Sequence, residues 1–214
     1  LDLGNPECRK WVTDHFDKLL TDEGIDIYRQ DYNIDPIEFW RAADAEDRQG
    51  ITEIRHVEGY LAYWDELLRR HPKMFIDTCA SGGRRNDVET LRRAVPMLRS
   101  DYIFEPVGEQ CHTYGVSFWI PFHGTGFIEI SKYLGRSCMA PEFTLGCDVR
   151  RKDIDYDMLR QLVKECRRMA PYFFGDYYPL TSYSLKNDVW IGWQYDRPDL
   201  GEGAVQVFRR ADSP

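Results

Sequence analysis

Short apolar runs alternate along this chain with longer stretches whose apolar residues recur every three or four positions. Asp31 directly follows the run at 25–30, and Cys79 directly follows the run at 74–78. This alternation is typical of a parallel α/β sheet, in which side chains at the carboxyl ends of the strands meet on one face. The pattern therefore predicts an α/β fold with its functional groups at that face.

The same patterns predict the remaining elements. Amphipathic helices are expected over 6–23, 54–70 and 158–169, with a shorter helix from Asp87 to Val95. Parallel strands are expected at 25–30, 74–78, 97–100, 117–122 and 143–149, and an antiparallel pair at 189–195 and 204–208. The pair has an apolar face for which the chain offers no partner sheet. An open doubly wound sheet is an alternative, but its dinucleotide fingerprint is absent, so part of a barrel fits better.

Charge and hydropathy exclude two classes of partner. The 214 residues carry a formal net charge of −8. Nucleic-acid binding depends largely on clustered Lys and Arg, so no nucleic-acid partner is expected. No apolar stretch approaches the roughly 20 residues that a membrane span requires, so no membrane partner is expected either.

The six cysteines are scattered without metal-ligand spacing, and His112 and His123 have no partners at zinc-type spacing. We therefore expect reduced thiols, a cytoplasmic location and no metal or other cofactor. The chain opens on Leu1 without an initiator Met, which suggests a fragment of a longer protein.

Asp31 and Asp101 are the candidate catalytic carboxylates. Arg29 beside Asp31 would lower the pKa of that carboxyl and keep it ionised, which suits a nucleophile. A general acid must instead hold its proton near neutral pH, a role open to Asp101. The alternatives are a loop-capping aspartate at 31 and a solvated loop aspartate at 101. Two converging carboxylates are what the cleavage of a glycosidic bond requires.

The stretch from Cys79 to Arg85 combines small residues with basic ones. Small residues let the backbone approach a ligand closely, and Arg side chains donate hydrogen bonds, so the loop could hold the hydroxyls of a sugar. It also precedes a helix N-terminus, and residues 82–87 could cradle a phosphate in a different kind of α/β domain. The Gly-Lys-Ser/Thr pattern of a phosphate-binding loop is missing.

Taken together, these segments resemble glycoside hydrolase family 36, the α-galactosidase family. Three motifs carry the resemblance: residues 29–33 against the family's Lys-Trp-Asp-Met-Asn, residues 79–85 against its Cys-x-x-Gly-Gly-x-Arg loop, and Ser100-Asp101 against its Ser-Asp pair. They occur in the family's order, with separations of 48 (79 − 31) and 22 (101 − 79) residues.

The resemblance implies roles for eight residues. Asp31 would be the nucleophile and Asp101 the acid/base, with their carboxyl groups roughly 5–6 Å apart as a retaining mechanism requires. The residues implied to bind the substrate are Arg29, Asn33, Cys79, Gly82, Gly83 and Arg85.

The resemblance also implies a (β/α)₈ TIM barrel between two β domains. Residues 1–172 would supply strands four to eight of the barrel, and residues 173–214 the start of the C-terminal antiparallel β domain. The chain departs from the family pattern at Arg29, Gln30 and Arg84, where the family has Lys, Trp and Gly. Arg is a wider and planar donor compared with Lys, so the exact sugar stays open.

The implied activity is that of a retaining glycoside hydrolase acting on terminal α-galactosides. The alternatives are an α-N-acetylgalactosaminidase, a related transglycosylase, and a sugar-binding remnant without turnover. The expected partner is an oligosaccharide or another glycoside, and a homo-oligomeric parent stays open.

Overall fold

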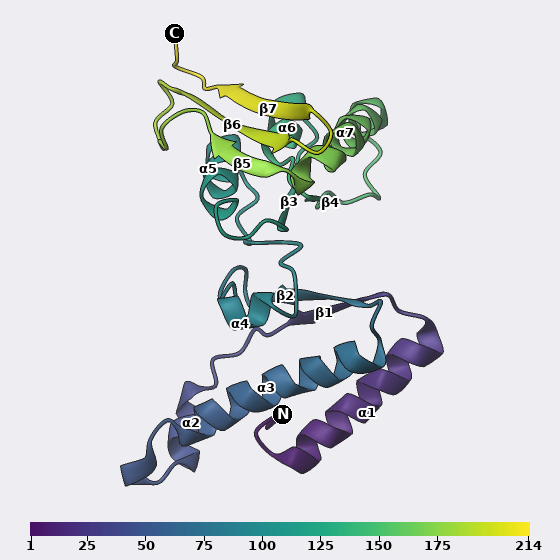
Figure 1. The fold of residues 1–214 in the computed structure, drawn as a ribbon, viewed down its shortest axis with the longest axis vertical. Helices are drawn as coiled ribbons and strands as arrows, with labels where there is room; N and C mark the ends of the chain where they lie inside the picture. The colour runs from purple at the N-terminus through teal and green to yellow at the C-terminus, as the bar shows by residue number, and fades with distance from the viewer. The chain divides into compact units, whose positions relative to one another are not determined.

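A computed structural model describes residues 1–214, which form two compact units, Leu1–Val95 and Pro96–Pro214. Figure 1 traces the chain through both units, and each is described by itself. None of the helices combines the length and apolar character needed to cross a membrane.

The first unit packs two long helices against a parallel pair of strands. In chain order its elements are α1 (Pro6–Glu23), β1 (Ile27–Asp31), α2 (Ile37–Ala43), a 3₁₀ turn (Glu46–Arg48), α3 (Ile51–Arg70), β2 (Phe75–Cys79) and α4 (Val88–Leu91). Strands β1 and β2 pair in parallel from Ile27 opposite Phe75 to Asp31 opposite Cys79. Helices α1 and α3 lie side by side along this pair (Figure 1).

The predicted bounds of α1 are confirmed and are explained by its caps, whereas α3 begins at Ile51, three residues before its expected start. The Asn5 side chain accepts hydrogen bonds from the first turn of α1, and Gly24 ends that helix in the left-handed conformation, with φ of 63°. The stripe of α3 supplies Tyr60, Tyr63 and Trp64 to the core, each at most 1% exposed. Burial of such aromatic side chains is the main stabilising contribution to this unit.

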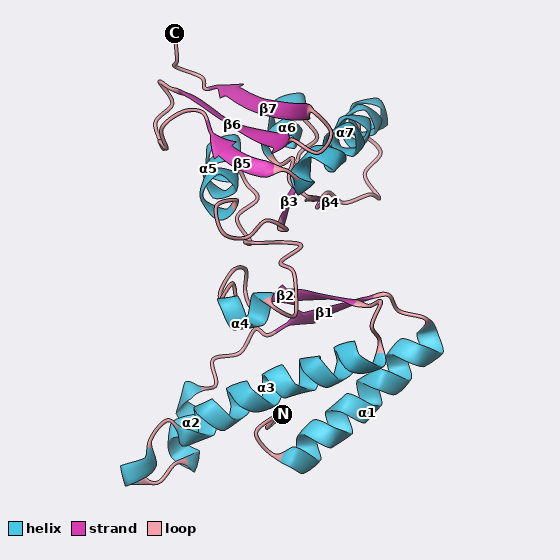
Figure 2. Ribbon diagram, in the orientation of Figure 1, coloured by secondary structure: helices cyan, strands magenta, loops and turns pink.

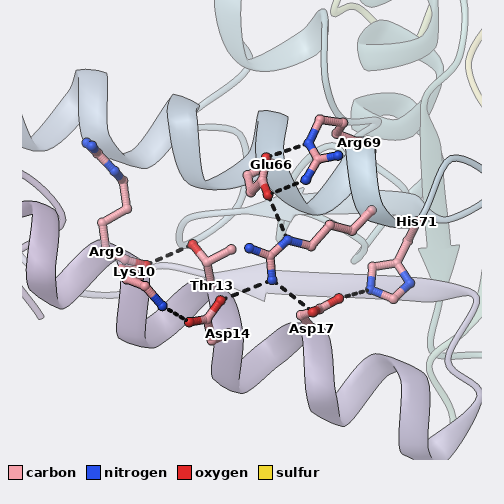
Figure 3. Close-up of polar contacts among 9 residues, drawn as sticks. Arg9, Lys10, Thr13, Asp14, Asp17, Glu66, Arg69 and His71 are labelled. Carbon is pink, nitrogen blue, oxygen red and sulfur yellow. Dashed lines mark hydrogen bonds and ion pairs between the residues drawn. The ribbon is translucent and has the colours of Figure 1, made fainter.

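A cluster of charged side chains joins α1 to α3 beside this core (Figure 3). The Arg70 guanidinium on α3 contacts Asp14 at 3.1 Å and Asp17 at 2.8 Å, both on α1, and Glu66 of its own helix at 2.7 Å. His71 adds a second contact to Asp17, at 2.8 Å. Arg70 therefore ties together three carboxylates from two helices.

The second unit contains two small sheets with helices around them (Figure 2). Its elements are α5 (Pro106–Val116), β3 (Gly124–Phe127), α6 (Lys132–Ser137), β4 (Glu142–Leu145), α7 (Tyr156–Met169), a 3₁₀ turn (Ala170–Phe174), β5 (Asp176–Pro179), β6 (Trp190–Arg197) and β7 (Glu202–Arg209). Strands β3 and β4 are parallel, whereas β5, β6 and β7 form an antiparallel sheet.

The apolar face of the β6–β7 pair has no partner sheet, as expected, but it is covered all the same. Ile191, Trp193 and Phe208 are almost fully buried, and Phe173 of the 3₁₀ turn and Tyr114 of α5 pack against them. Helical segments, rather than a second sheet, complete this core. The predicted antiparallel pair itself is confirmed.

Two of the five predicted parallel strands are wrong, and the three confirmed ones join the unpredicted β3 in two separate pairs, β1–β2 and β3–β4. Residues 117–122 continue the end of α5, since Ile120 N–H donates to Val116 at 2.9 Å. Residues 97 and 98 form a turn, and the contacts with Gly124 at the start of β3 are backbone hydrogen bonds to the Pro96 carbonyl oxygen and from the Arg99 N–H. Pro96 lacks the N–H that a strand would need there.

Helix α5 and the short elements α2, α6, β3 and β5 were not predicted. Helix α4 also ends at Leu91, earlier than the expected Val95, although Asp87 caps it as predicted. Val95 instead bridges to Asp77 of β2.

Candidate active site

Strand β1 presents its charged residues on the face opposite the helices. Tyr28 and Gln30 point toward α3, where the Gln30 side chain accepts a hydrogen bond from Trp64 Nε1 at 2.7 Å. Arg29 and Asp31 alternate with them and are exposed. Because a strand has a side-chain period of two, this alternation places the candidate nucleophile on the solvent side.

Arg29 forms its ion pair with Asp77, its register neighbour on β2, and not with Asp31. Asp77 is only 4% exposed, so its charge needs a partner of this kind. We expected Arg29 to be the main reason that Asp31 stays ionised, and that expectation was wrong. The Arg29 charge lowers the pKa of Asp31 less than the neighbouring hydrogen-bonding groups do.

The pKa of Asp31 nevertheless lies below its ordinary value. Partial burial alone would raise it, but hydrogen bonds from the Asn33 side chain, the Cys79 thiol and the Ser81 N–H outweigh that effect. Burial raises the pKa of Cys79, which keeps the thiol protonated and able to donate. Asp31 is therefore an exposed carboxylate whose ionised form is favoured by these neighbouring polar groups.

The loop after β2 makes a tight turn that brings backbone groups next to Asp31. Ser81 and Gly82 both have positive φ, at 48° and 82°. Gly82 is suited to this conformation because it has no Cβ. Ala80 bridges to Gly83, and the Cys79 thiol contacts the Gly82 carbonyl oxygen at 3.9 Å. The small residues of this loop thus allow the tight turn of its backbone.

Arg85 lies between two aromatic rings. Its guanidinium carbon is 4.5 Å from the ring centre of Tyr32 and 4.9 Å from that of Tyr60. The Tyr32 hydroxyl in turn contacts His56 Nε2 at 3.1 Å. Cation–π contacts of this kind hold a guanidinium in place without neutralising its charge.

A cavity of about 470 Å³ adjoins these rings. Tyr32, Trp40, Tyr60 and Arg85 contribute to its walls, whereas Asp31 does not. Its aromatic and charged lining could accept a polar ligand with apolar faces.

Asp101 belongs to the second unit, where it lies exposed in a bend. The neighbouring Ser100 hydroxyl accepts a hydrogen bond from Tyr102 N–H at 3.1 Å, and the Tyr102 hydroxyl donates to Glu105 at 2.7 Å. The separation of Asp31 from Asp101 stays a prediction, since the two residues lie in different units.

A buried polar network lies directly before Asp101 in the chain. Arg99, with its side chain 1% exposed, forms an ion pair with Glu109 at 3.0 Å, and Thr125 donates to the same carboxylate at 2.6 Å. Arg99 also contacts His123 Nδ1 at 3.0 Å, and His123 Nε2 contacts the Ser117 hydroxyl at 3.0 Å. This network fixes the backbone from which Asp101 projects.

The structure gathers seven of the eight predicted site residues in the first unit and leaves Asp101 in the second. Arg29, Asp31 and Asn33 come from β1 and the residues after it, and Cys79, Gly82, Gly83 and Arg85 from β2 and its loop. Sequence reasoning missed Ser81 and the aromatic pair Tyr32 and Tyr60. Ser81 and Tyr32 lie within the motifs, which was a signal, whereas Tyr60 approaches Arg85 from α3 and carried none.

Comparisons with known proteins agree with this arrangement. A family model described as Melibiase matches residues 1–127. The α-galactosidase AgaA of Geobacillus stearothermophilus is 24% identical over 225 residues, which cover 98% of this chain and 30% of that protein. The chain thus spans about a third of the length of this relative.

Solved structures share the fold of the whole chain. The α-galactosidase of Lactobacillus brevis has a TM-score of 0.84 at 18% identity and covers 100% of this chain, which corresponds to 31% of its own. AgaA of G. stearothermophilus in complex with 1-deoxygalactonojirimycin has a TM-score of 0.83 at 22% identity, with 100% of this chain and 32% of that chain covered. Part of the fold of family 36 α-galactosidases is therefore present here.

Proposed function

Because the chain belongs to the Melibiase family, we propose that the protein carrying it is a retaining α-galactosidase with Asp31 as nucleophile and Asp101 as acid/base. The resemblance to glycoside hydrolase family 36 is confirmed. The observation that carries the proposal is Asp31 itself, an ionised and exposed carboxylate at the carboxyl end of a parallel strand. Catalytic groups of α/β barrels occupy this position.

The spacing of the two aspartates supports their assignment. AgaA was crystallised with raffinose and with stachyose in forms that each carry one replaced aspartate, and these two positions stand 70 residues apart. Asp31 and Asp101 are also 70 residues apart (101 − 31).

In the proposed reaction, an Asp31 oxygen attacks the anomeric carbon of the terminal galactose while Asp101 gives its proton to the departing glycosidic oxygen. The products of this step are a covalent galactosyl–Asp31 ester and the released alcohol. Asp101, now ionised, takes a proton from water, whose oxygen displaces Asp31. Two inversions at the same carbon return the α-configured sugar.

The substrate is proposed to be an oligosaccharide with a terminal α-galactosyl group, as raffinose and stachyose are. Asn33, Cys79, Gly82 and Gly83 would contact the sugar next to the nucleophile. Arg29 is committed to Asp77, and Arg85 to its two tyrosine rings, so both would act at the margin of the pocket. The α-N-acetylgalactosaminide, transglycosylase and non-catalytic alternatives remain outcomes of the test.

The finer fold assignment is part of the same proposal. We place residues 1–172 as strands four to eight of a (β/α)₈ barrel and residues 173–214 as the start of a C-terminal β domain. The antiparallel sheet of β5, β6 and β7 after residue 172 supports this boundary. The cytoplasmic location and the homo-oligomeric parent stay predictions.

The test replaces Asp31 in the full-length gene product. We expect Asp31→Asn and Asp31→Ala to abolish turnover of an aryl α-galactoside, because neither variant has a nucleophile. Added azide should restore turnover in Asp31→Ala and yield the β-galactosyl azide, since a small anion then attacks from the side that Asp31 occupied.

The configuration of the azide product is measured by NMR. Reaction rates, binding and substrate preference separate the alternatives. Near-normal rates in both Asp31 variants would show that Asp31 is structural. A wild-type protein that binds galactosides but never cleaves them would be the non-catalytic remnant. Preference for an aryl α-N-acetylgalactosaminide would change the substrate and keep the mechanism.

A further inference from the structure

The Asn33 side chain connects the glycine-rich loop to Asp31. Asn33 Oδ1 accepts a hydrogen bond from the Ser81 N–H at 2.7 Å and a second from the Ser81 hydroxyl at 2.9 Å. A backbone N–H can only donate, so the Asn33 atom that faces it must be the carbonyl oxygen. The orientation of the Asn33 amide is thereby determined by chemistry.

The NH₂ group of Asn33 is consequently available to Asp31. Its hydrogen bond is the strongest of the contributions that lower the pKa of the Asp31 carboxyl. Rotation of the amide by half a turn would instead present the carbonyl oxygen to the carboxylate, and the two acceptors would repel each other. The effect of Asn33 on Asp31 thus depends on what holds its other end.

Ser81 holds that other end from a strained backbone position. Its φ of 48° lies in the left-handed region, where a residue with a Cβ is uncommon. Glycine would adopt this conformation without strain but would lack the hydroxyl. The two hydrogen bonds to Asn33 offset the strain and also fasten the loop to the end of β1.

We infer that Ser81 is a positioning residue of the proposed reaction: its N–H and hydroxyl hold the Asn33 amide so that the amide NH₂ faces the nucleophile Asp31. This inference rests on the proposed function, because it gives Asp31 the role of nucleophile. Asn33 keeps the carboxylate ionised and aimed in the unliganded enzyme. Ser81 acts only through Asn33.

The experiment removes the Ser81 hydroxyl in the full-length gene product and measures kcat/KM for an aryl α-galactoside against pH. We expect Ser81→Ala to lower kcat/KM about five- to tenfold, the usual effect of one lost hydrogen bond to a polar group. The acid limb of the profile should also move to higher pH, because a less firmly held Asn33 lets Asp31 bind a proton more readily.

Two further variants separate positioning from a merely structural role. Ser81→Gly relaxes the backbone but also lacks the hydroxyl, so it should shift the acid limb as Ser81→Ala does. In an Asn33→Ala background, Ser81→Ala should produce no additional shift, since the residue through which it acts is gone. Ser131→Ala, which removes a helix-capping hydroxyl in the second unit, is the control and should leave the acid limb in place.

Failure of this inference is distinguishable from failure of the proposed function. If Asp31→Ala is inactive but Ser81→Ala leaves the acid limb unmoved, Ser81 has no positioning role. Additive shifts from Ser81 and Asn33 would overturn the inference as well. If Asp31→Ala retains activity, the proposed function fails and the role of Ser81 fails with it.

Discussion

At the scale of single residues, burial determines the charge state of His123. The ring is 2% exposed, and burial lowers the pKa of His123 well below its ordinary value, with the Arg99 charge acting in the same direction. Glu109 is the carboxylate in this network, but its contact is to Arg99. The folded protein therefore holds His123 neutral.

This state predicts a loss of stability in mild acid. The unfolded chain binds a proton at His123 as the pH falls through about 6.5, whereas the folded chain does not. Stability is thus fully present above that pH and declines below it, by up to about 1.4 kcal/mol per pH unit for one proton. We expect His123→Asn to flatten this slope in denaturant unfolding measured on either side of pH 6.5.

The exposed His15, on α1, offers a control, and His15→Asn should keep the wild-type slope. Burial also lowers the pKa of His112, so the His123 variant should lose only part of the dependence. An unchanged slope in His123→Asn would mean that the network opens and protonates without unfolding.

At the scale of elements, Arg70 joins α1 to α3, and its neighbour Arg69 provides a matched comparison (Figure 3). Arg69 contacts only Glu66, on the same helix, whereas Arg70 also reaches Asp14 and Asp17 on α1. We expect Arg70→Met to lower Tm by a few degrees and Arg69→Met to change it much less, because exposed pairs within one helix contribute little.

Salt dependence checks the physical cause. In about 1 M salt the screening length shrinks to roughly 3 Å, so the Tm difference between Arg70→Met and the wild type should narrow. Equal losses in the two variants, or a loss that salt does not reduce, would show that the Arg70 stem matters for packing and that its charge does not.

Elements with their own local signals were predictable from sequence. Helix α1 has Asn5 and Gly24 at its ends, and α3 and α7 have clear apolar stripes. Residues 117–122 were mistaken for a strand because an aromatic run resembles one. Helix α5 before them was missed because its N-cap is Glu105, which accepts from Val107 and Gly108 N–H at 2.7 Å each and is not one of the usual capping residues. The ion pair between Arg29 and Asp77 could not be predicted from the sequence either, because the register of β1 against β2 determines which residue lies beside Arg29.

At the scale of the whole molecule, both units expose large apolar side chains. Phe75 of β2 is 60% exposed, and in the second unit Phe118 and Phe174 are 60% and 69% exposed. Strand β1 pairs only with β2, which leaves its other edge open. Open edges and apolar patches of this kind favour association.

We therefore expect residues 1–214, expressed alone, to be poorly soluble and inactive. The chain spans about a third of the length of AgaA. If the rest of the parent protein supplies substrate-orienting contacts, their loss would cost on the order of 10²-fold or more in rate. The measurement compares this piece with the full-length gene product by sedimentation and by hydrolysis of aryl α-galactoside and aryl α-N-acetylgalactosaminide. Asp31 and its neighbours Asn33, Cys79 and Ser81 are all present in the piece, so a monomer with full activity would mean that these local contacts, together with Asp101, suffice for catalysis.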